Sequence, residues 1–103
     1  MEISEKYLLE QVTEYTKSIK ANTEFSVEEY ITIGRIWNTI AYEKKLLESD
    51  LGRNFHDLVR DQLVGKMVDA LQMETSRGYS FYSKRFDFAL GGIMDERYRY
   101  KIK

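Results

Sequence analysis

The stretch RYRYKIK at residues 97–103 alternates cationic and apolar side chains and carries the most evident chemical signal in the sequence. Arginine and lysine bind phosphates and carboxylates, while tyrosine rings stack on bases or pack at protein interfaces. Nucleic-acid binding and protein binding therefore compete as functions for this stretch. A purely structural role competes with both, because alternating charges also protect an edge strand from aggregation.

A run of aromatic residues precedes this stretch. The sequence YSFYSKRFDF at residues 79–88 holds five aromatic side chains within ten positions. Tyrosine and arginine are the residue types enriched where proteins meet proteins. Some of these rings are expected to pack on the helices, and the others to form a partner-binding surface with the basic residues. The predicted surface consists of Tyr79, Phe81, Tyr82, Lys84, Arg85, Arg97, Tyr98, Arg99, Tyr100 and Lys101.

Charge is distributed unevenly along the chain, whose net charge is −1. Residues 79–103 hold six Lys or Arg against three acids, a balance of +3, and residues 1–78 hold ten against fourteen, a balance of −4. A net charge near zero argues against a general nucleic-acid coat protein. A small nucleic-acid-binding transcriptional regulator remains the alternative function, with the basic C-terminal segment resembling the wing of a winged-helix protein.

Catalytic residue sets are sparse. His56 is the only histidine and the chain has no cysteine, so the sequence predicts neither a two-histidine metal site nor a cysteine nucleophile. The acidic pairs at 28–29 and 57–61 lack the Glu-x-x-His pattern of carboxylate-bridged metal bundles. The glycine pair at 91–92 lacks the spacing and the lysine of a phosphate loop. We therefore expect no enzyme activity, no cofactor and no bound metal.

Length and composition indicate one cytoplasmic domain spanning residues 1–103. No stretch reaches the roughly 18 apolar residues of a membrane span, and the acidic, amphipathic start does not resemble a signal peptide. The absence of cysteine suits a reducing compartment. A chain without proline and rich in lysine, isoleucine, glutamate and tyrosine is typical of AT-rich bacterial genomes, their phages and mobile elements.

The first helix is predicted over residues 5–20. Its apolar positions follow one helix face, and they include Leu8, Val12, Tyr15 and Ile19. Ser4 is positioned as the N-cap, and Asn22 is expected to end the helix.

A capping box predicts the start of the second helix. Ser26 is followed three residues later by Glu29, and Phe25 and Tyr30 are placed as a hydrophobic staple. The helix is predicted over residues 27–48. Because it is apolar on more than one face, we expect it to be central and its second face to be covered by another copy of the chain, in a homodimer.

A third helix is predicted over residues 54–76, where an apolar stripe recurs at helical spacing. Asn54 and Asp57 form a cap-like pair at its start, and Gly78 is expected to stop it.

The apolar period then changes from helical spacing to alternation. Residues 85–90 and 97–102 both alternate apolar and polar side chains, which predicts a β-hairpin around the glycines at 91–92. Tyr98, Tyr100 and Ile102 are expected to face the helices, and Arg97, Arg99 and Lys101 to face water. The predicted fold class is thus α+β, mainly helical, with three helices followed by a C-terminal hairpin. An all-α four-helix domain is the alternative, and it must accommodate both glycines in a helix.

Taken together, the residues favour a small non-enzymatic protein-protein interaction or inhibitor protein that acts through an aromatic and basic C-terminal surface.

Overall fold

The described part of the chain is mainly helical, with a short parallel sheet that pairs residues 2–3 with residues 101–102. A computed structural model describes residues 2–75 and 99–103. The elements, in chain order, are β1 (Glu2–Ile3), α1 (Glu5–Lys20), α2 (Val27–Tyr42), α3 (Lys44–Glu48), α4 (Asp50–Leu58), the π-helical segment η1 (Val59–Leu63), α5 (Val64–Thr75) and β2 (Lys101–Ile102).

Helix α1 confirms the predicted first helix at both ends. The Ser4 Oγ accepts a hydrogen bond of 3.1 Å from the backbone N–H of Tyr7, as an N-cap does. After the helix, Asn22 adopts a φ of 55°, the left-handed conformation that asparagine tolerates better than most residues.

Helix α2 begins with the predicted capping box. The Ser26 Oγ accepts from the Glu29 backbone N–H at 3.2 Å, and Glu29 Oε1 accepts from the Ser26 N–H at 3.0 Å. The Phe25 and Tyr30 rings lie 5.6 Å apart, centroid to centroid, in an edge-on arrangement. The staple and the capping box together fix where the chain enters the helix.

Replacing Ser26 with alanine is expected to lower the free energy of unfolding by about 0.5 to 2 kcal/mol, because the first turn of α2 loses its cap. The measurement is urea unfolding followed by circular dichroism. Ser18→Ala is the matched control, since Ser18 lies inside α1 and alanine is the better helix former there. Equal stability of the Ser26→Ala variant and the wild type would contradict the role of the box.

Helix α2 ends at Tyr42, six residues before the predicted end, and that part of the prediction was wrong. Glu43 has φ −98° and ψ 91°, which interrupts the helix, and residues 44–48 form the separate helix α3. If the helix continued without a break, Leu46 would lie one turn after Tyr42 on the same helix face. That face is exposed at Tyr42, so Leu46 would be exposed as well. The break redirects the chain and lets Leu46 enter the core, where it is 5% exposed.

The next helix starts at Asp50, and the predicted cap at Asn54 was wrong. The Ser49 Oγ accepts from the Gly52 N–H at 3.1 Å and donates to the Leu46 carbonyl oxygen at 2.6 Å. Gly52 packs so tightly against α3 that a Cβ there would overlap the Leu46 carbonyl oxygen and lie 2.8 Å from its carbonyl carbon. A serine cap and a glycine contact therefore set this boundary.

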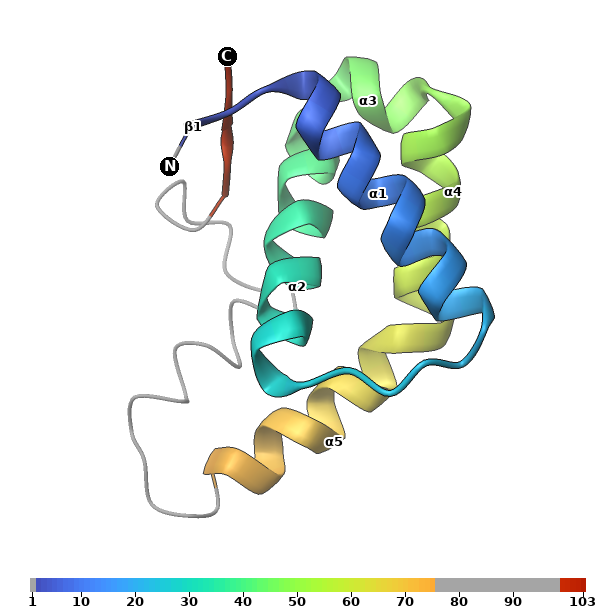
Figure 1. The fold of residues 1–103 in the computed structure, drawn as a ribbon, viewed down its shortest axis with the longest axis vertical. Coiled ribbons are helices and arrows are strands. Elements are labelled where there is room, and N and C mark those ends of the chain that lie inside the picture. The colour runs from blue at the N-terminus through green and yellow to red at the C-terminus, as the bar shows by residue number, and fades with distance from the viewer. Residues whose placement is uncertain (1, 76–98) are drawn as a thin grey trace.

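The predicted third helix consists of α4, η1 and α5, which follow one another without a loop. Figure 1 shows α4 and α5 running in different directions on either side of the π-helical segment. The buried residues Phe55, Val59, Leu63 and Met67 recur at every fourth position. In an α-helix each such step advances about 40° beyond a full turn, so the row would drift around the helix. A π turn holds more residues per turn and offsets this drift.

The α5 segment extends to Thr75, close to the predicted end at 76. The expected stop at Gly78 lies outside the described residues.

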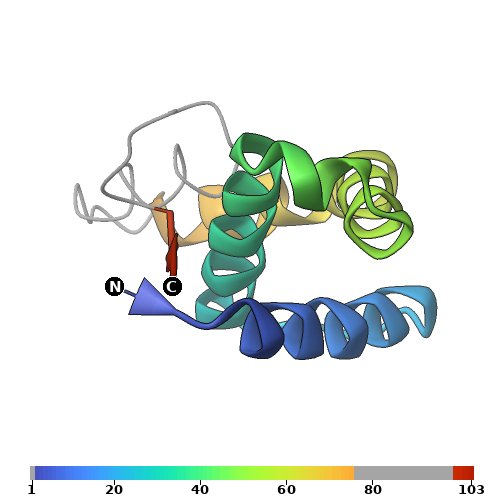
Figure 2. The same cartoon turned by 90° about the horizontal axis from the view of Figure 1, so that it is seen from above.

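Strands β1 and β2 pair in parallel, with Glu2 opposite Lys101 and Ile3 opposite Ile102. The two ends of the chain lie side by side in Figures 1 and 2. Strand character near residue 101 was predicted, whereas the partner β1 was not. The expected pairing with residues 85–90, and the choice between hairpin and fourth helix, fall outside the part of the chain that the structure describes.

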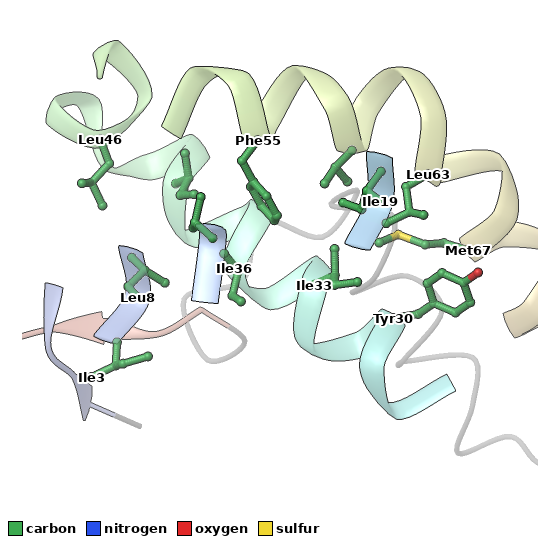
Figure 3. Close-up of a cluster of buried hydrophobic side chains, with 13 residues drawn as sticks. Ile3, Leu8, Ile19, Tyr30, Ile33, Ile36, Leu46, Phe55, Leu63 and Met67 are labelled. Atoms are coloured by element: carbon green, nitrogen blue, oxygen red, sulfur yellow. The ribbon is translucent and has the colours of Figure 1, made fainter. Parts of the chain in front are cut away.

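The core is built around α2. Its Ile33, Ile36 and Ile40 are at most 1% exposed, and α1, α4 and α5 pack against this helix (Figure 3). Among the residues whose burial is described, Phe55 from α4 is the largest fully buried side chain. Much of the apolar surface that suggested a second copy of the chain is thus covered by helices of the same chain.

Candidate functional site

The C-terminal segment is attached to α2 by a hydrogen bond that reaches across the fold. The Tyr100 backbone N–H donates to the Thr39 Oγ1 at 3.0 Å, and the Thr39 hydroxyl in turn donates to the Arg35 carbonyl oxygen at 2.7 Å. Thr39 is fully buried, so the bond is shielded from competing water. This contact fixes the position of Tyr100 along α2.

Two arginine–tyrosine pairs surround this attachment point. The Arg35 guanidinium carbon lies 5.3 Å from the centre of the Tyr100 ring, and that of Arg99 lies 4.4 Å from the centre of the Tyr42 ring. Both distances are within the range of cation–π attraction. Each segment thus supplies an arginine to the tyrosine of the other. We name Arg35, Tyr42, Arg99, Tyr100 and Lys101 the arginine–tyrosine surface.

Exposure differs along the C-terminal strand. Tyr100 and Ile102 are partly buried against the core and Lys101 is exposed, as the predicted alternation requires. Arg99 was expected to face water, but it is only partly exposed because its guanidinium lies over the Tyr42 ring. Tyr42 keeps 42% of its surface exposed. The surface therefore combines an accessible ring with positive charge.

The remaining cations at the strand end are accessible. Lys103 is exposed like Lys101, and its backbone N–H donates to the Ile3 carbonyl oxygen at 3.0 Å. Within residues 2–75 and 99–103, no ion pair involves Lys101 or Lys103.

The structure brings three of the ten predicted partner-binding residues together, namely Arg99, Tyr100 and Lys101. The other seven lie outside the described residues, and they are Tyr79, Phe81, Tyr82, Lys84, Arg85, Arg97 and Tyr98. Sequence analysis did not select Arg35 and Tyr42. A signal was present for Arg35, because it is the only Lys or Arg between residues 21 and 43.

His56 packs against an aromatic ring. Its imidazole lies 5.4 Å from the Trp37 ring, with 37° between the planes, and 20% of the side chain is exposed. The Asp57 carboxylate is 3.8 Å from Nδ1. His56 therefore lies at the contact of α4 with α2, and most of its side chain is buried.

The acidic residues beside His56 are paired with an arginine. Arg60 Nε lies 2.9 Å from Asp61 Oδ1, and Arg60 Nη1 lies 3.4 Å from Asp57 Oδ1. The hydrogen bond from Arg60 lowers the pKa of the Asp61 carboxyl, and the same contact raises the pKa of Arg60. Among the described residues, no group of three or more His, Cys, Asp or Glu is arranged to hold a metal ion.

None of the helices described in residues 2–75 is both long and apolar enough to cross a membrane. No protein-family model, curated protein or solved structure matches this chain.

Replacing Thr39 with valine is expected to cost about 1 to 3 kcal/mol of stability, because the shape is kept while the Tyr100 N–H loses its acceptor. Urea unfolding of purified variants measures the change. Thr16→Val is the matched control: the Thr16 hydroxyl also donates to a carbonyl four residues earlier, at 2.7 Å, but accepts no long-range bond from residues 2–75 or 99–103. Equal losses in the two variants would show that the bond to Tyr100 contributes nothing.

Proposed function

We propose that this chain is a small non-enzymatic protein that binds, and thereby inhibits or regulates, a protein partner through its aromatic and basic C-terminal surface. The observation that carries the proposal is the reciprocal pair of cation–π contacts, of Arg35 with Tyr100 and of Arg99 with Tyr42, beside the exposed Lys101. Tyrosine and arginine are the residues that most often contribute large shares of binding energy at protein interfaces.

Preorganisation supports this function. A long arginine side chain loses conformational entropy when a partner immobilises it, and this loss weakens binding. Stacking on a tyrosine ring restricts Arg99 before the partner arrives. The buried bond from Tyr100 to Thr39 holds the backbone of the same segment in place. A surface of this kind loses little additional conformational entropy when a partner binds.

The non-enzymatic part of the proposal rests on how the reactive side chains are used. His56 packs against Trp37, and Asp61 accepts hydrogen bonds from both Nε–H and Nη2–H of Arg60. These groups are engaged in packing and surface ion pairs, which is the ordinary structural use of such residues.

The alternative function is a nucleic-acid-binding regulator, favoured by the cluster Arg99, Lys101 and Lys103 beside tyrosine rings. The helices support it less well. A recognition helix presents a polar face to the groove, but the polar side of α4 and η1 carries the carboxylates of Asp57 and Asp61 at the surface. These carboxylates would repel phosphate.

A homodimer stays a prediction, as do a cytoplasmic location and a bacterial, phage or mobile-element origin. Self-association is checked by light scattering at high micromolar concentration, where a mass of 12.3 kDa would indicate a monomer.

The experiment that tests the proposed function is affinity capture from nuclease-treated lysate, with tagged wild type and a Tyr42→Ala, Lys101→Gln double variant in parallel. We expect a specific protein to be retained by the wild type and lost with the variant. Lys17→Gln is the control, because Lys17 is a largely exposed cation near the far end of α1. Retention that disappears after nuclease treatment would support the nucleic-acid alternative instead.

A further inference from the structure

The segment that carries the arginine–tyrosine surface and the helices beneath it have opposite net charges, which limits the kind of partner that can bind. Residues 2–75 hold nine Lys or Arg against fourteen Asp or Glu, a balance of −5. Residues 99–103 hold three cations and no acid. This positive segment therefore lies on a helical body whose described residues carry a net negative charge.

We propose that the arginine–tyrosine surface binds a short acidic segment of a partner protein, with carboxylates on the arginines and lysines and an apolar or aromatic side chain on the Tyr42 ring. This inference rests on the proposed function and specifies the class of partner.

Guanidinium geometry favours carboxylates at this site. A guanidinium presents five N–H donors in a plane, and two parallel donors match the two oxygens of a carboxylate. The Tyr42 ring, 4.4 Å from the Arg99 guanidinium carbon, and the Tyr100 ring, 5.3 Å from that of Arg35, restrict where each group can lie. Lys101 and Lys103 add two exposed cations on the same strand.

The surroundings favour a peptide over a nucleic acid. Glu2 is the register partner of Lys101, and Glu43 directly follows Tyr42, and both are exposed. A nucleic-acid backbone carries charge at regular, close intervals. It would bring phosphates against these carboxylates and against the acidic helices. A short acidic peptide can contact the cations alone and leave the flanking acids in water.

The test is fluorescence anisotropy with a fluorescein-labelled peptide of alternating glutamate and tyrosine. Two comparison probes are the same peptide with lysine in place of glutamate, and a single-stranded oligonucleotide of equal net charge. We expect the acidic peptide to bind more tightly than both, with affinity that falls as salt rises. Arg99→Gln and Lys101→Gln should each weaken binding about 1.5-fold to fivefold, as for exposed ion pairs. Lys17→Gln should leave binding unchanged.

Other outcomes separate this inference from the proposed function. Tighter binding of the oligonucleotide, or an equal effect of Lys17→Gln and Arg99→Gln, would overturn the acidic-segment inference. If the acidic peptide fails to bind while lysate capture still depends on Tyr42 and Lys101, the surface binds protein through a different chemistry. If capture fails as well, both proposals are wrong. A further variant is Arg99→Lys, which keeps the positive charge but lacks the planar donors. It should bind the acidic peptide more tightly than Arg99→Gln and more weakly than the wild type.

Discussion

Replacing Gly52 with alanine is expected to destabilise the domain by about 3 kcal/mol or more, the upper end of the cost of overpacking a close contact. A Cβ at this position meets the Leu46 carbonyl group, and backbone atoms cannot move aside as a flexible side chain can. The turn between α3 and α4 is further held by both hydrogen bonds of the Ser49 hydroxyl. Urea unfolding measures the loss of stability.

The same substitution at Gly65 is the control. Apart from its chain neighbours and its own helix backbone, no described atom lies within 4 Å of the position that a Cβ would take at Gly65, and Gly65 is exposed near the start of α5. Alanine is the better helix former by about 1 kcal/mol, so Gly65→Ala is expected to raise stability. Opposite signs for the two variants would support the close approach of α3 and α4. A stable Gly52→Ala protein would mean that the turn between them is built differently.

Replacing Tyr100 with alanine is expected to cost about 2 to 4 kcal/mol, somewhat less than the 3 to 5 kcal/mol of a fully buried aromatic, because Tyr100 is partly exposed. The ring packs against the core, contacts the Arg35 guanidinium and anchors the segment that pairs with β1. Urea unfolding of the variant and the wild type, monitored by Trp37 fluorescence, measures the change in the free energy of unfolding.

Two companion variants test which part of this segment stabilises the fold. Tyr100→Phe keeps the ring and should cost less than about 1 kcal/mol. Arg99→Ala removes a cation–π contact on a half-exposed ring and should also cost no more than about 1 kcal/mol. A larger loss from Arg99→Ala than from Tyr100→Ala would contradict the orientation of the strand, since a shift of one residue exchanges its two faces.

Helix starts were predictable where the determinants are local. Ser4 and the Ser26–Glu29 pair each bond to backbone groups three residues away, so both ends of each interaction are visible in a few letters of sequence. The starts of α1 and α2 were therefore placed correctly. The end of α1 was also predictable, because Asn22 accepts the left-handed backbone conformation that follows it.

The features that the prediction missed depend on contacts between elements. No glycine or proline marks the break at Glu43, and its reason is the burial of Leu46 in the assembled core. Serine and asparagine are equally good N-caps, so sequence alone does not favour Ser49 over Asn54 as the start of α4. The close approach of Gly52 to α3 is one of the contacts that favour Ser49. A strand of two residues such as β1 is too short to show a periodic pattern, and its partner lies at the other end of the described chain.

The candidate site shows the same division. Alternation identified Arg99, Tyr100 and Lys101 as a unit, because the signal lies within consecutive residues. Arg35 and Tyr42 belong to the surface only because the C-terminal segment crosses α2 at Thr39. Sequence spacing on α2 places them near one face, but it does not say what covers that face.

The parallel pairing of β1 with β2 also has a kinetic consequence. Residues 2 and 101 must meet across about one hundred positions of chain, a non-local contact of the kind that forms late because loop closure costs entropy. The helices, whose contacts are more local, can assemble first. During synthesis β2 leaves the ribosome after every described helix. The arginine–tyrosine surface is thus completed only when Tyr100 docks on Thr39, so binding competence is expected to arise in the last step of folding.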